Sequence, residues 1–189
     1  MSDDLETLRN RIWLTSKARK FAEHKCHQRN VSLHFVVFIS TVTVIGFSVF
    51  QDDFCSPAAA SKAITSVSVL LLAISIFLFG QRFGERAVMH RECYLRLDRL
   101  RDQSESAEEL AREYANVLHA YPNHTSADFD SFVYSEIVLN RRSVTDPSGE
   151  EYKATFKRGL SYFGITLSTW VWPLAALAGA YLIWTFMQC

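Results

Sequence analysis

The stretch from Asn30 to Gln51 reads NVSLHFVVFISTVTVIGFSVFQ and contains no Asp, Glu, Lys or Arg. Two later windows, Ala63 to Gln81 and Gly159 to Cys189, also lack these residues. The three windows hold 22, 19 and 31 residues, and roughly 20 apolar residues in a helix cross the hydrocarbon core of a bilayer. The sequence therefore predicts an all-α integral membrane protein, with a transmembrane helical hairpin followed by a third C-terminal span.

A cleaved signal peptide is the main competing interpretation of the first window, because PAAAS at residues 57–61 resembles a cleavage site. The basic leader of about 30 residues and the apolar run of about 20 are both too long, since signal peptides have apolar cores of roughly 7–15 residues. We therefore expect the first window to remain in the protein as a span.

The charge pattern predicts four segments and their orientation. Seven of the 20 Lys and Arg residues precede the first span, one lies in the first connection and twelve lie between the second and third spans. Cytoplasmic segments carry the Lys and Arg excess, so the N-terminus is predicted inside and the C-terminus outside. The expected segments are a basic N-terminal helix (1–30), a transmembrane hairpin (31–80, with spans 31–50 and 63–80), a helical cytoplasmic region (81–158) and a third transmembrane segment (159–189).

Composition and motifs argue against several functions. The 20 basic residues are balanced by 20 acidic ones, which is not typical of a nucleic-acid binder. The sequence contains no G-x-x-x-x-G-K-[ST], G-x-S-x-G, H-E-x-x-H or C-x-x-C motif. His24, Cys26 and His27 cluster in sequence, but they do not share one face of a helix. We therefore predict no catalytic residue, no cofactor and no bound metal.

The long cytoplasmic segment reads as helical. The second span is expected to continue as a helix past Arg82, and Ser106 with Glu109 predicts a capping box at a new helix. That helix should bury one apolar stripe and end at Pro122; the stripe consists of Leu110, Tyr114, Val117 and Tyr121.

Polar residues recur along one face of each hairpin span. In the first span these are His34, Thr41 and Ser48, and in the second they are Thr65, Ser68 and Ser75. One interpretation is that they line a water-filled path in an oligomer. The alternative is that the hydroxyls bond to their own backbone or pack closely against neighbours. His34 is a functional candidate because ionisable groups inside spans are costly, although its position also suits a side chain that reaches the interface.

The third span contains Pro173, which favours a kink. Ala175 and Gly179 are small residues four positions apart, and this spacing lets another helix approach closely. We interpret them as oligomer or packing contacts. Cys55 and Cys189 share the outside compartment, and whether they form a disulfide stays open.

The basic leader includes RIWLTSKARKFAEH at residues 11–24. Its basic residues are spread around the helix, unlike those of a helix that lies on a membrane surface. Its apolar residues form two nearly opposed faces, so we expect it to pack between cytoplasmic helices and another subunit. Trp13 and Phe21 are the predicted contacts.

The chain resembles a known family in the leader RIWLTSKAR, the two closely spaced spans, the helix leaving the second span, the stretch YANVLHAYPNHTSADFDSF (114–132) and the final hydrophobic segment. These features are similar to the SLATT family, the SMODS- and SLOG-associating two-transmembrane effectors of bacterial conflict systems, in the subset with an additional C-terminal span. The resemblance implies a multi-pass protein of the inner membrane, with a periplasmic C-terminus, that oligomerises and forms a pore or disrupts the membrane, causing growth arrest or death.

The resemblance also implies partners besides the lipid bilayer and further copies of the chain. These are a cyclic-nucleotide synthase, a SLOG-type sensor or a reverse transcriptase encoded nearby. Tyr114, His124 and Asp128 are the candidate partner or signal contacts, although His124 and Asp128 also suit helix caps. The alternative function is a non-conducting membrane scaffold that recruits a soluble partner through its cytoplasmic helices.

Overall fold

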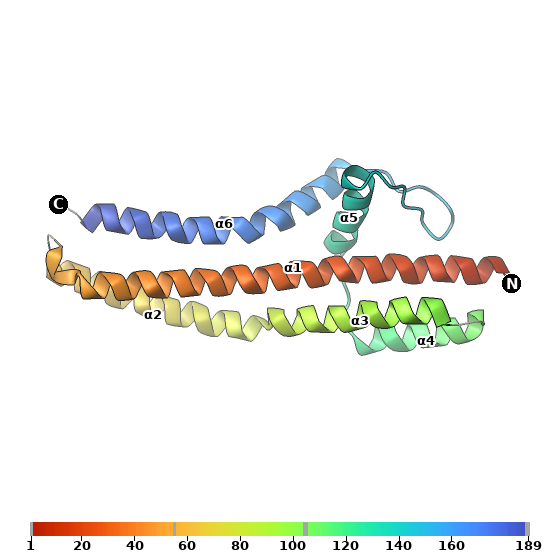
Figure 1. Cartoon of the computed structure of the whole chain (residues 1–189), viewed down its shortest axis with the longest axis horizontal. Helices are drawn as coiled ribbons and strands as arrows, with labels where there is room; N and C mark the ends of the chain where they lie inside the picture. The colour runs from red at the N-terminus through yellow and green to blue at the C-terminus, as the bar shows by residue number, and fades with distance from the viewer. Residues whose placement is uncertain (1, 55, 104–105, 188–189) are drawn as a thin grey trace. The chain divides into compact units, whose positions relative to one another are not determined.

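The computed structural model describes residues 2–54, 56–103 and 106–187, and nearly all of them are helical (Figure 1). Within these ranges there is no β-strand, and one isolated bridge pairs Thr145 with Glu151. Three helices are long and apolar enough to cross a membrane. The predicted all-α membrane fold is confirmed.

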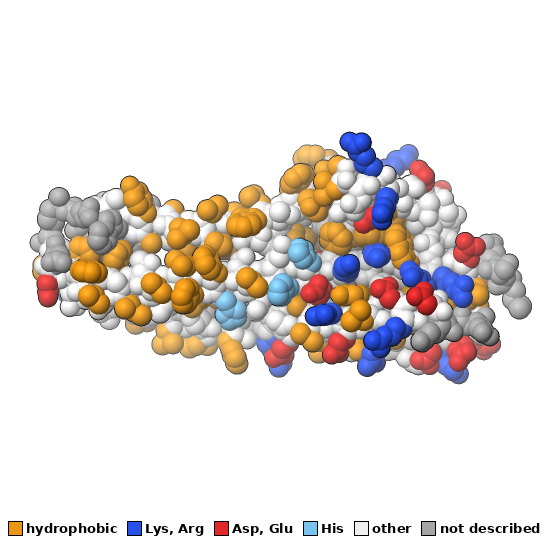
Figure 2. All heavy atoms as spheres, viewed as in Figure 1, with side chains coloured by type: hydrophobic (Ala, Val, Ile, Leu, Met, Phe, Trp, Pro, Cys, Tyr) orange, Lys and Arg blue, Asp and Glu red, His pale blue; other side chains and the backbone are white. Residues whose placement is uncertain are grey.

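The chain divides into two compact units. The charged unit comprises Met1–His27 and Phe83–Thr166, and the apolar unit comprises Gln28–Arg82 and Leu167–Cys189. The elements, in chain order, are α1 (Ser2–Val49), the 3-10 turn η1 (Gln51–Asp53), α2 (Pro57–Gln81), α3 (Phe83–Gln103), α4 (Ala107–Ala120), α5 (Ser126–Tyr134), the π-helix η2 (Ser135–Leu139) and α6 (Phe156–Met187). On the face shown in Figure 2, Lys, Arg, Asp and Glu gather over the charged unit, and hydrophobic side chains cover the helices of the apolar unit.

The predicted leader and first span form one continuous helix, α1, of 48 residues. The sequence has no Gly before Gly46 and no Pro before Pro57, so nothing interrupts the helix at the border of the charged leader. α1 thus contributes residues to both units.

The helix predicted to continue from the second span is present as α3, with one local break at the junction. α2 ends at Gln81, and Arg82 caps it in the left-handed conformation with φ of 51° before α3 begins at Phe83. The backbone N–H of Arg82 donates to the carbonyl of Phe79 at 3.4 Å. A non-glycine residue in this region costs backbone energy, so the junction is a local interruption between two helices.

A first core of the charged unit joins α1, α3 and α4. Ile12, Cys93, Leu97 and Leu110 are completely buried in it, and the predicted stripe residues Tyr114, Val117 and Tyr121 pack against it. α4 ends at Ala120, just before Pro122, as expected. The predicted capping box at its start is wrong, because the N-cap residue Ser106 makes no side-chain capping hydrogen bond.

A second core covers another side of α1. Leu14 packs there with Phe132, Val133 and Val144. The predicted contacts Trp13 and Phe21 also lie on this core: their ring centroids are 5.8 Å and 6.0 Å from that of Phe132. The two opposed apolar faces of the leader are therefore both packed within one chain.

The first three turns of α6, residues 156–166, belong to the charged unit and pack against Tyr134. A Cβ atom at Gly159 would lie 3.1 Å from Cε2 of the Tyr134 ring, so glycine permits this close approach. Tyr134 also contacts the rings of Tyr162 and Phe163. Next to these rings, Arg158 forms an ion pair with Asp130 at 3.2 Å.

The apolar unit has little buried surface of its own. A small core of Phe47, Phe54 and Ala60 closes the turn of the hairpin. In the most apolar window of each of the three spans, 6%, 0% and 6% of the residues are buried. α6 continues through Pro173 as one helix. The spans therefore present nearly all their side chains to lipid or to other chains. Cys26 and Cys93 are free and buried, whereas the Cys55–Cys189 pairing concerns residues outside the described ranges.

Candidate functional site

Four of the five predicted stripe hydroxyls bond to their own helices. Thr41 donates to the carbonyl of Val37 at 2.7 Å, and Thr65 donates to that of Ser61 at 2.9 Å. Ser68 and Ser75 do the same over four residues, at 2.8 Å and 2.7 Å. This is the backbone-bonding alternative, but each hydroxyl oxygen keeps the capacity to accept a hydrogen bond.

The stripes lie largely uncovered in the single chain. His34, Thr41 and Ser48 are exposed on α1, and Thr65 and Ser68 are exposed on α2, while Ser75 is half-buried. Among the described residues no hydrogen bond joins the α1 stripe to the α2 stripe. A path lined by both stripes therefore requires more than one copy of the chain.

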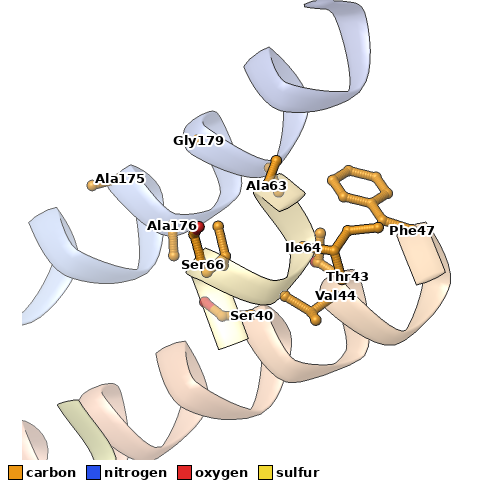
Figure 3. Close-up of a pocket in the computed structure, with 12 residues that line it drawn as sticks. Ser40, Thr43, Val44, Phe47, Ala63, Ile64, Ser66, Ala175, Ala176 and Gly179 are labelled. Carbon is orange, nitrogen blue, oxygen red and sulfur yellow. The ribbon is translucent and has the colours of Figure 1, made fainter. Parts of the chain in front are cut away.

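The small residues of the third span line a groove inside the apolar unit (Figure 3). Ala175, Ala176 and Gly179 of α6 face the hairpin across a space of about 470 Å³. On the hairpin side the groove is lined by Ser40, Thr43, Val44 and Phe47 from α1 and by Ala63, Ile64, Ser66 and Val67 from α2. The predicted packing face of Ala175 and Gly179 is thus turned towards the hairpin of the same chain, and its role in oligomer contacts remains a prediction.

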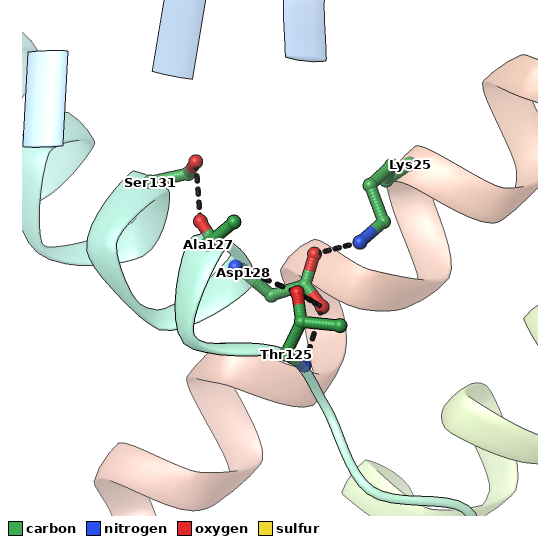
Figure 4. Close-up of polar contacts among 5 residues, drawn as sticks. All are labelled: Lys25, Thr125, Ala127, Asp128 and Ser131. Atoms are coloured by element: carbon green, nitrogen blue, oxygen red, sulfur yellow. Dashed lines mark hydrogen bonds and ion pairs between the residues drawn. The ribbon is translucent and has the colours of Figure 1, made fainter. Parts of the chain in front are cut away.

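A buried ion pair joins α1 to the start of α5 (Figure 4). The Lys25 ammonium donates to Oδ1 of Asp128, and their side chains are 13% and 2% exposed. Oδ2 of Asp128 accepts from the backbone N–H of Thr125 at 2.8 Å and from its hydroxyl at 2.7 Å. The hydroxyl oxygen of Thr125 accepts in turn from the backbone N–H of Asp128 at 3.3 Å, which completes a capping box.

These contacts set the protonation state of the carboxyl group. Burial alone would raise the pKa of Asp128, but the hydrogen bonds from Lys25 and Thr125 outweigh it and hold the pKa below its usual value. Asp128 is therefore ionised at neutral pH.

Arg19 fixes the connection between α4 and α5. Its side chain is completely buried and donates to the carbonyl of Pro122 and, at 3.2 Å, to Oδ1 of Asn123. Burial, reinforced by the positive charge of Arg19, lowers the pKa of His90 to about 4 and also lowers the pKa of His124. Both imidazoles are neutral at neutral pH, and the Nδ1 atoms of both are buried without a hydrogen-bond partner in the described part of the chain.

Two of the predicted signal contacts are engaged inside the charged unit. The hydroxyl of Tyr114 lies 2.8 Å from that of Thr15, and Asp128 pairs with Lys25. His124 is half-buried. Tyr114 holds α4 against α1, and Asp128 holds α5 against α1. The role of all three residues in partner binding remains a prediction.

A polar cleft of about 850 Å³ lies between the start of α1 and the loop before α6. Arg9, Asn10, Trp13 and Arg101 line it together with the loop at residues 145–149. Asn10 donates to the carbonyl of Asp146 at 3.1 Å, which holds the loop at the edge of the cleft. No sequence pattern indicates this cleft, because residues more than 130 positions apart form it.

Arg19, Lys25 and His90 were likewise not predicted as site residues from the sequence. A usable signal existed for Arg19, which follows Ile12 by seven residues and therefore lies on the same face of α1 as a core residue. Within residues 2–54, 56–103 and 106–187, no group of three His, Cys, Asp or Glu side chains could hold a metal ion.

The fold and the exposed spans define a helical membrane protein with a charged helical unit. The family model of the SMODS and SLOG-associating 2TM effector domain family 5 (SLATT_5) matches residues 1–188, and the chain belongs to this family. Membership implies a membrane effector in defence systems. Neither the curated proteins nor the solved structures gave a match to the chain.

Proposed function

We propose that this chain is the membrane effector of a bacterial antiphage or conflict system. Several copies assemble in the inner membrane and open a conducting path, and the resulting leak causes growth arrest or cell death. The observation that carries the proposal is the set of polar side chains exposed on otherwise apolar spans.

The spans are surrounded by lipid hydrocarbon instead of water. Hydrocarbon offers no hydrogen-bond partner to a hydroxyl or imidazole, so exposed polar groups there favour contact with water or with another chain. Because the spans bury almost nothing within one chain, further copies have room to cover them. An assembly with the stripes inward satisfies the polar groups and creates an aqueous path.

The charged unit suits the role of receiver for the activating signal. The distribution of Lys and Arg supports its placement on the cytoplasmic side, with the C-terminus in the periplasm. We propose that the trigger is a separate partner or its diffusible product, supplied by a cyclic-nucleotide synthase, a SLOG-type sensor or a reverse transcriptase encoded nearby. This trigger contacts the polar cleft lined by Arg9, Trp13 and Arg101. The proposal assigns the chain no catalytic activity and no direct binding of nucleic acid.

Dye and ion leak from cells that express the chain tests the proposal. Replacing His34, Thr41 and Thr65 by Leu should abolish the leak, because the path loses its polar lining. The matched control replaces three exposed valines, Val31, Val42 and Val69, by Leu and should leave the leak unchanged. A leak that persists after His34, Thr41 and Thr65 are replaced by Leu would contradict the conducting path.

A non-conducting scaffold is the second candidate function. The observation that favours it is that four of the stripe hydroxyls already bond to their own backbone, so these groups do not require water. In that case the charged unit would recruit a soluble defence partner while the spans act as an anchor. Protection of cells without any leak would favour the scaffold.

A further inference from the structure

The groove between α6 and the hairpin is wider than its small residues require. Small residues such as Ala175 and Gly179 let two helices approach closely, yet a Cβ atom added at Gly179 would meet nothing within 4 Å. The three helices instead enclose a space of about 470 Å³ (Figure 3). Ligand sites in proteins occupy roughly 300–1,000 Å³, so the groove has room for a ligand.

The lining of the groove favours an apolar ligand over water. Nine of the twelve lining residues are Ala, Val, Ile, Phe or Gly. The hydroxyl of Thr43 donates to the carbonyl of Ile39, and that of Ser66 donates to the carbonyl of Lys62, both at 2.9 Å. A water molecule inside a protein typically makes about three hydrogen bonds, and this lining offers few groups for them.

The groove lies at the depth of one leaflet of the bilayer. Ser40 and Phe47, which line it, lie eleven and eighteen residues beyond Arg29, the last charged residue before the first span. At about 1.5 Å per residue these positions are roughly 16 Å and 27 Å along α1, in a hydrocarbon layer roughly 30 Å thick. The groove therefore extends from near the middle of the layer to the surface on the side of the hairpin turn.

A cation lies at the end of the groove nearer the hairpin turn. Lys62 is exposed and is the only Lys or Arg between Arg29 and Arg82. It precedes Ser66 by four residues, so it lies on the face of α2 that lines the groove. Within the described ranges its ammonium makes no ion pair or hydrogen bond. Phospholipid headgroups lie at the edge of the hydrocarbon layer, and a Lys ammonium binds a phosphate as a point charge.

The surfaces on both sides of the groove face lipid. At most 6% of the residues in the most apolar window of each span are buried within the chain. An acyl chain in the groove is therefore continuous with the lipid that surrounds the spans. Its phosphate would meet the positive charge of Lys62, so one molecule fits both the apolar lining and the cation.

We propose that the groove binds one acyl chain of a phospholipid whose phosphate pairs with Lys62. The acyl chain lies between α6 and the hairpin and contacts Val44, Ile64 and Ala176. It fills the space that the small residues of α6 leave and thereby supports the packing of the third span. This site goes beyond the proposed function, because it belongs to a single chain and does not require conduction.

Lipid that stays bound to the full-length chain after extraction into mild detergent tests the site. Mass spectrometry of the intact complex should show one phospholipid per chain. Gly179→Leu should remove most of it, because the leucine side chain enters the groove. The matched control is Ala178→Leu, at an exposed neighbour outside the lining, and it should keep the lipid. Equal retention by the two variants would overturn the proposal.

The headgroup contact has its own variant, which leaves the groove unfilled. Lys62→Gln should weaken lipid retention about fivefold, the effect of one basic residue near a lipid surface. Lys153→Gln, at an exposed lysine of the charged unit, should leave retention unchanged. This comparison decides the question even if Gly179→Leu fails to fold. No loss on replacement of Lys62 would contradict the phosphate contact.

A phosphatidylcholine with a photoreactive diazirine in its acyl chain locates the bound lipid. Activation after extraction should label residues 40–47 and 175–180. Residues 70–79 of α2, where Leu70 and Phe79 are exposed outside the groove, should stay unlabelled. Equal labelling of all three segments would contradict a bound acyl chain. Chains that associate through the groove and retain no lipid would show that another copy fills it, which would also overturn the proposal.

The outcomes separate this site from the proposed function. Lipid retained by chains that never leak would support the site and contradict the pore. A leak from chains that retain no lipid would contradict the site and leave the pore intact.

Discussion

The Lys25 ammonium and the Asp128 carboxylate form a buried ion pair that links α1 to the first turn of α5. Breaking a buried pair leaves one uncompensated charge, which typically costs about 3–5 kcal/mol. We predict that Lys25→Met lowers the stability of the charged unit by several kcal/mol, on the order of that range. Hydrogen exchange of the α5 amides in the full-length, solubilised chain measures the effect.

The exposed Lys20 offers a matched control for Lys25. Lys20→Met should change α5 protection little, because an exposed surface charge contributes about 0–1 kcal/mol. Equal protection in the Lys25 and Lys20 variants would contradict a stabilising role for the pair.

Trp13 provides a test of what the leader contacts. Its ring packs edge-on against that of Phe132 within one chain, so Trp13→Ala should destabilise the charged unit, and Trp13→Phe should restore much of that stability. Thermal unfolding followed by circular dichroism measures both. If Trp13→Ala dissociated oligomers while leaving the unfolding temperature unchanged, the subunit contact predicted from the sequence would be the better account.

His90 should make the stability of the charged unit depend on pH. Its pKa is about 4 in the folded chain, against 6.5 for an unperturbed imidazole. Because the pKa of His90 is lower in the folded chain than in the unfolded one, the contribution of His90 to stability is fully present above about pH 6.5. As the pH falls from about 6.5 towards 4, the unfolded chain binds a proton on His90 before the folded chain does, and this stability is lost. The loss amounts to at most about 3 kcal/mol at 1.36 kcal/mol per unit.

Unfolding temperatures of wild type and His90→Gln between pH 7.5 and 4.5 test this dependence. The variant should lose less stability over the interval than the wild type. Asp128 should add a loss only at still lower pH, because its folded pKa lies below 3.8. Parallel curves for the two proteins would show that His90 does not carry the dependence.

Gly159 and Gly164 form a matched pair at the start of α6. An added Cβ at Gly159 would lie 3.1 Å from the Tyr134 ring, whereas nothing lies within 4 Å of one at Gly164. Gly159→Ala should therefore stabilise the charged unit less than Gly164→Ala, which should raise its stability by up to about 1 kcal/mol through helix propensity. The comparison uses unfolding temperatures, and a higher value for Gly159→Ala than for Gly164→Ala would argue against the close contact.

The spans and the helical class were predictable because they depend on local composition. A charge-free window such as residues 30–51 is long enough to cross the lipid as a helix, which satisfies its backbone hydrogen bonds within the segment. The α4 stripe was predictable for a similar reason, since Leu110 and Tyr114 share a face through helical periodicity alone.

Other features depend on contacts between distant residues. Lys25 and Asp128 are more than 100 positions apart, and in the sequence Lys25 looks like one more charge in a basic leader. The capping box expected at Ser106 lies instead at Thr125, because tertiary packing of α5 on α1 decides which polar side chain is held in place. The break between α2 and α3 could not be predicted in the same way, because position 82 is Arg and not Gly or Pro.

The membrane potential of cells that express the chain together with its neighbouring gene tests the central claim most directly. The account predicts that the potential collapses before growth stops, and that Thr65→Leu combined with Ser68→Leu prevents both events while the chain stays in the membrane. A potential that remains intact while the cells are protected or stop growing would contradict the conducting path and favour the scaffold.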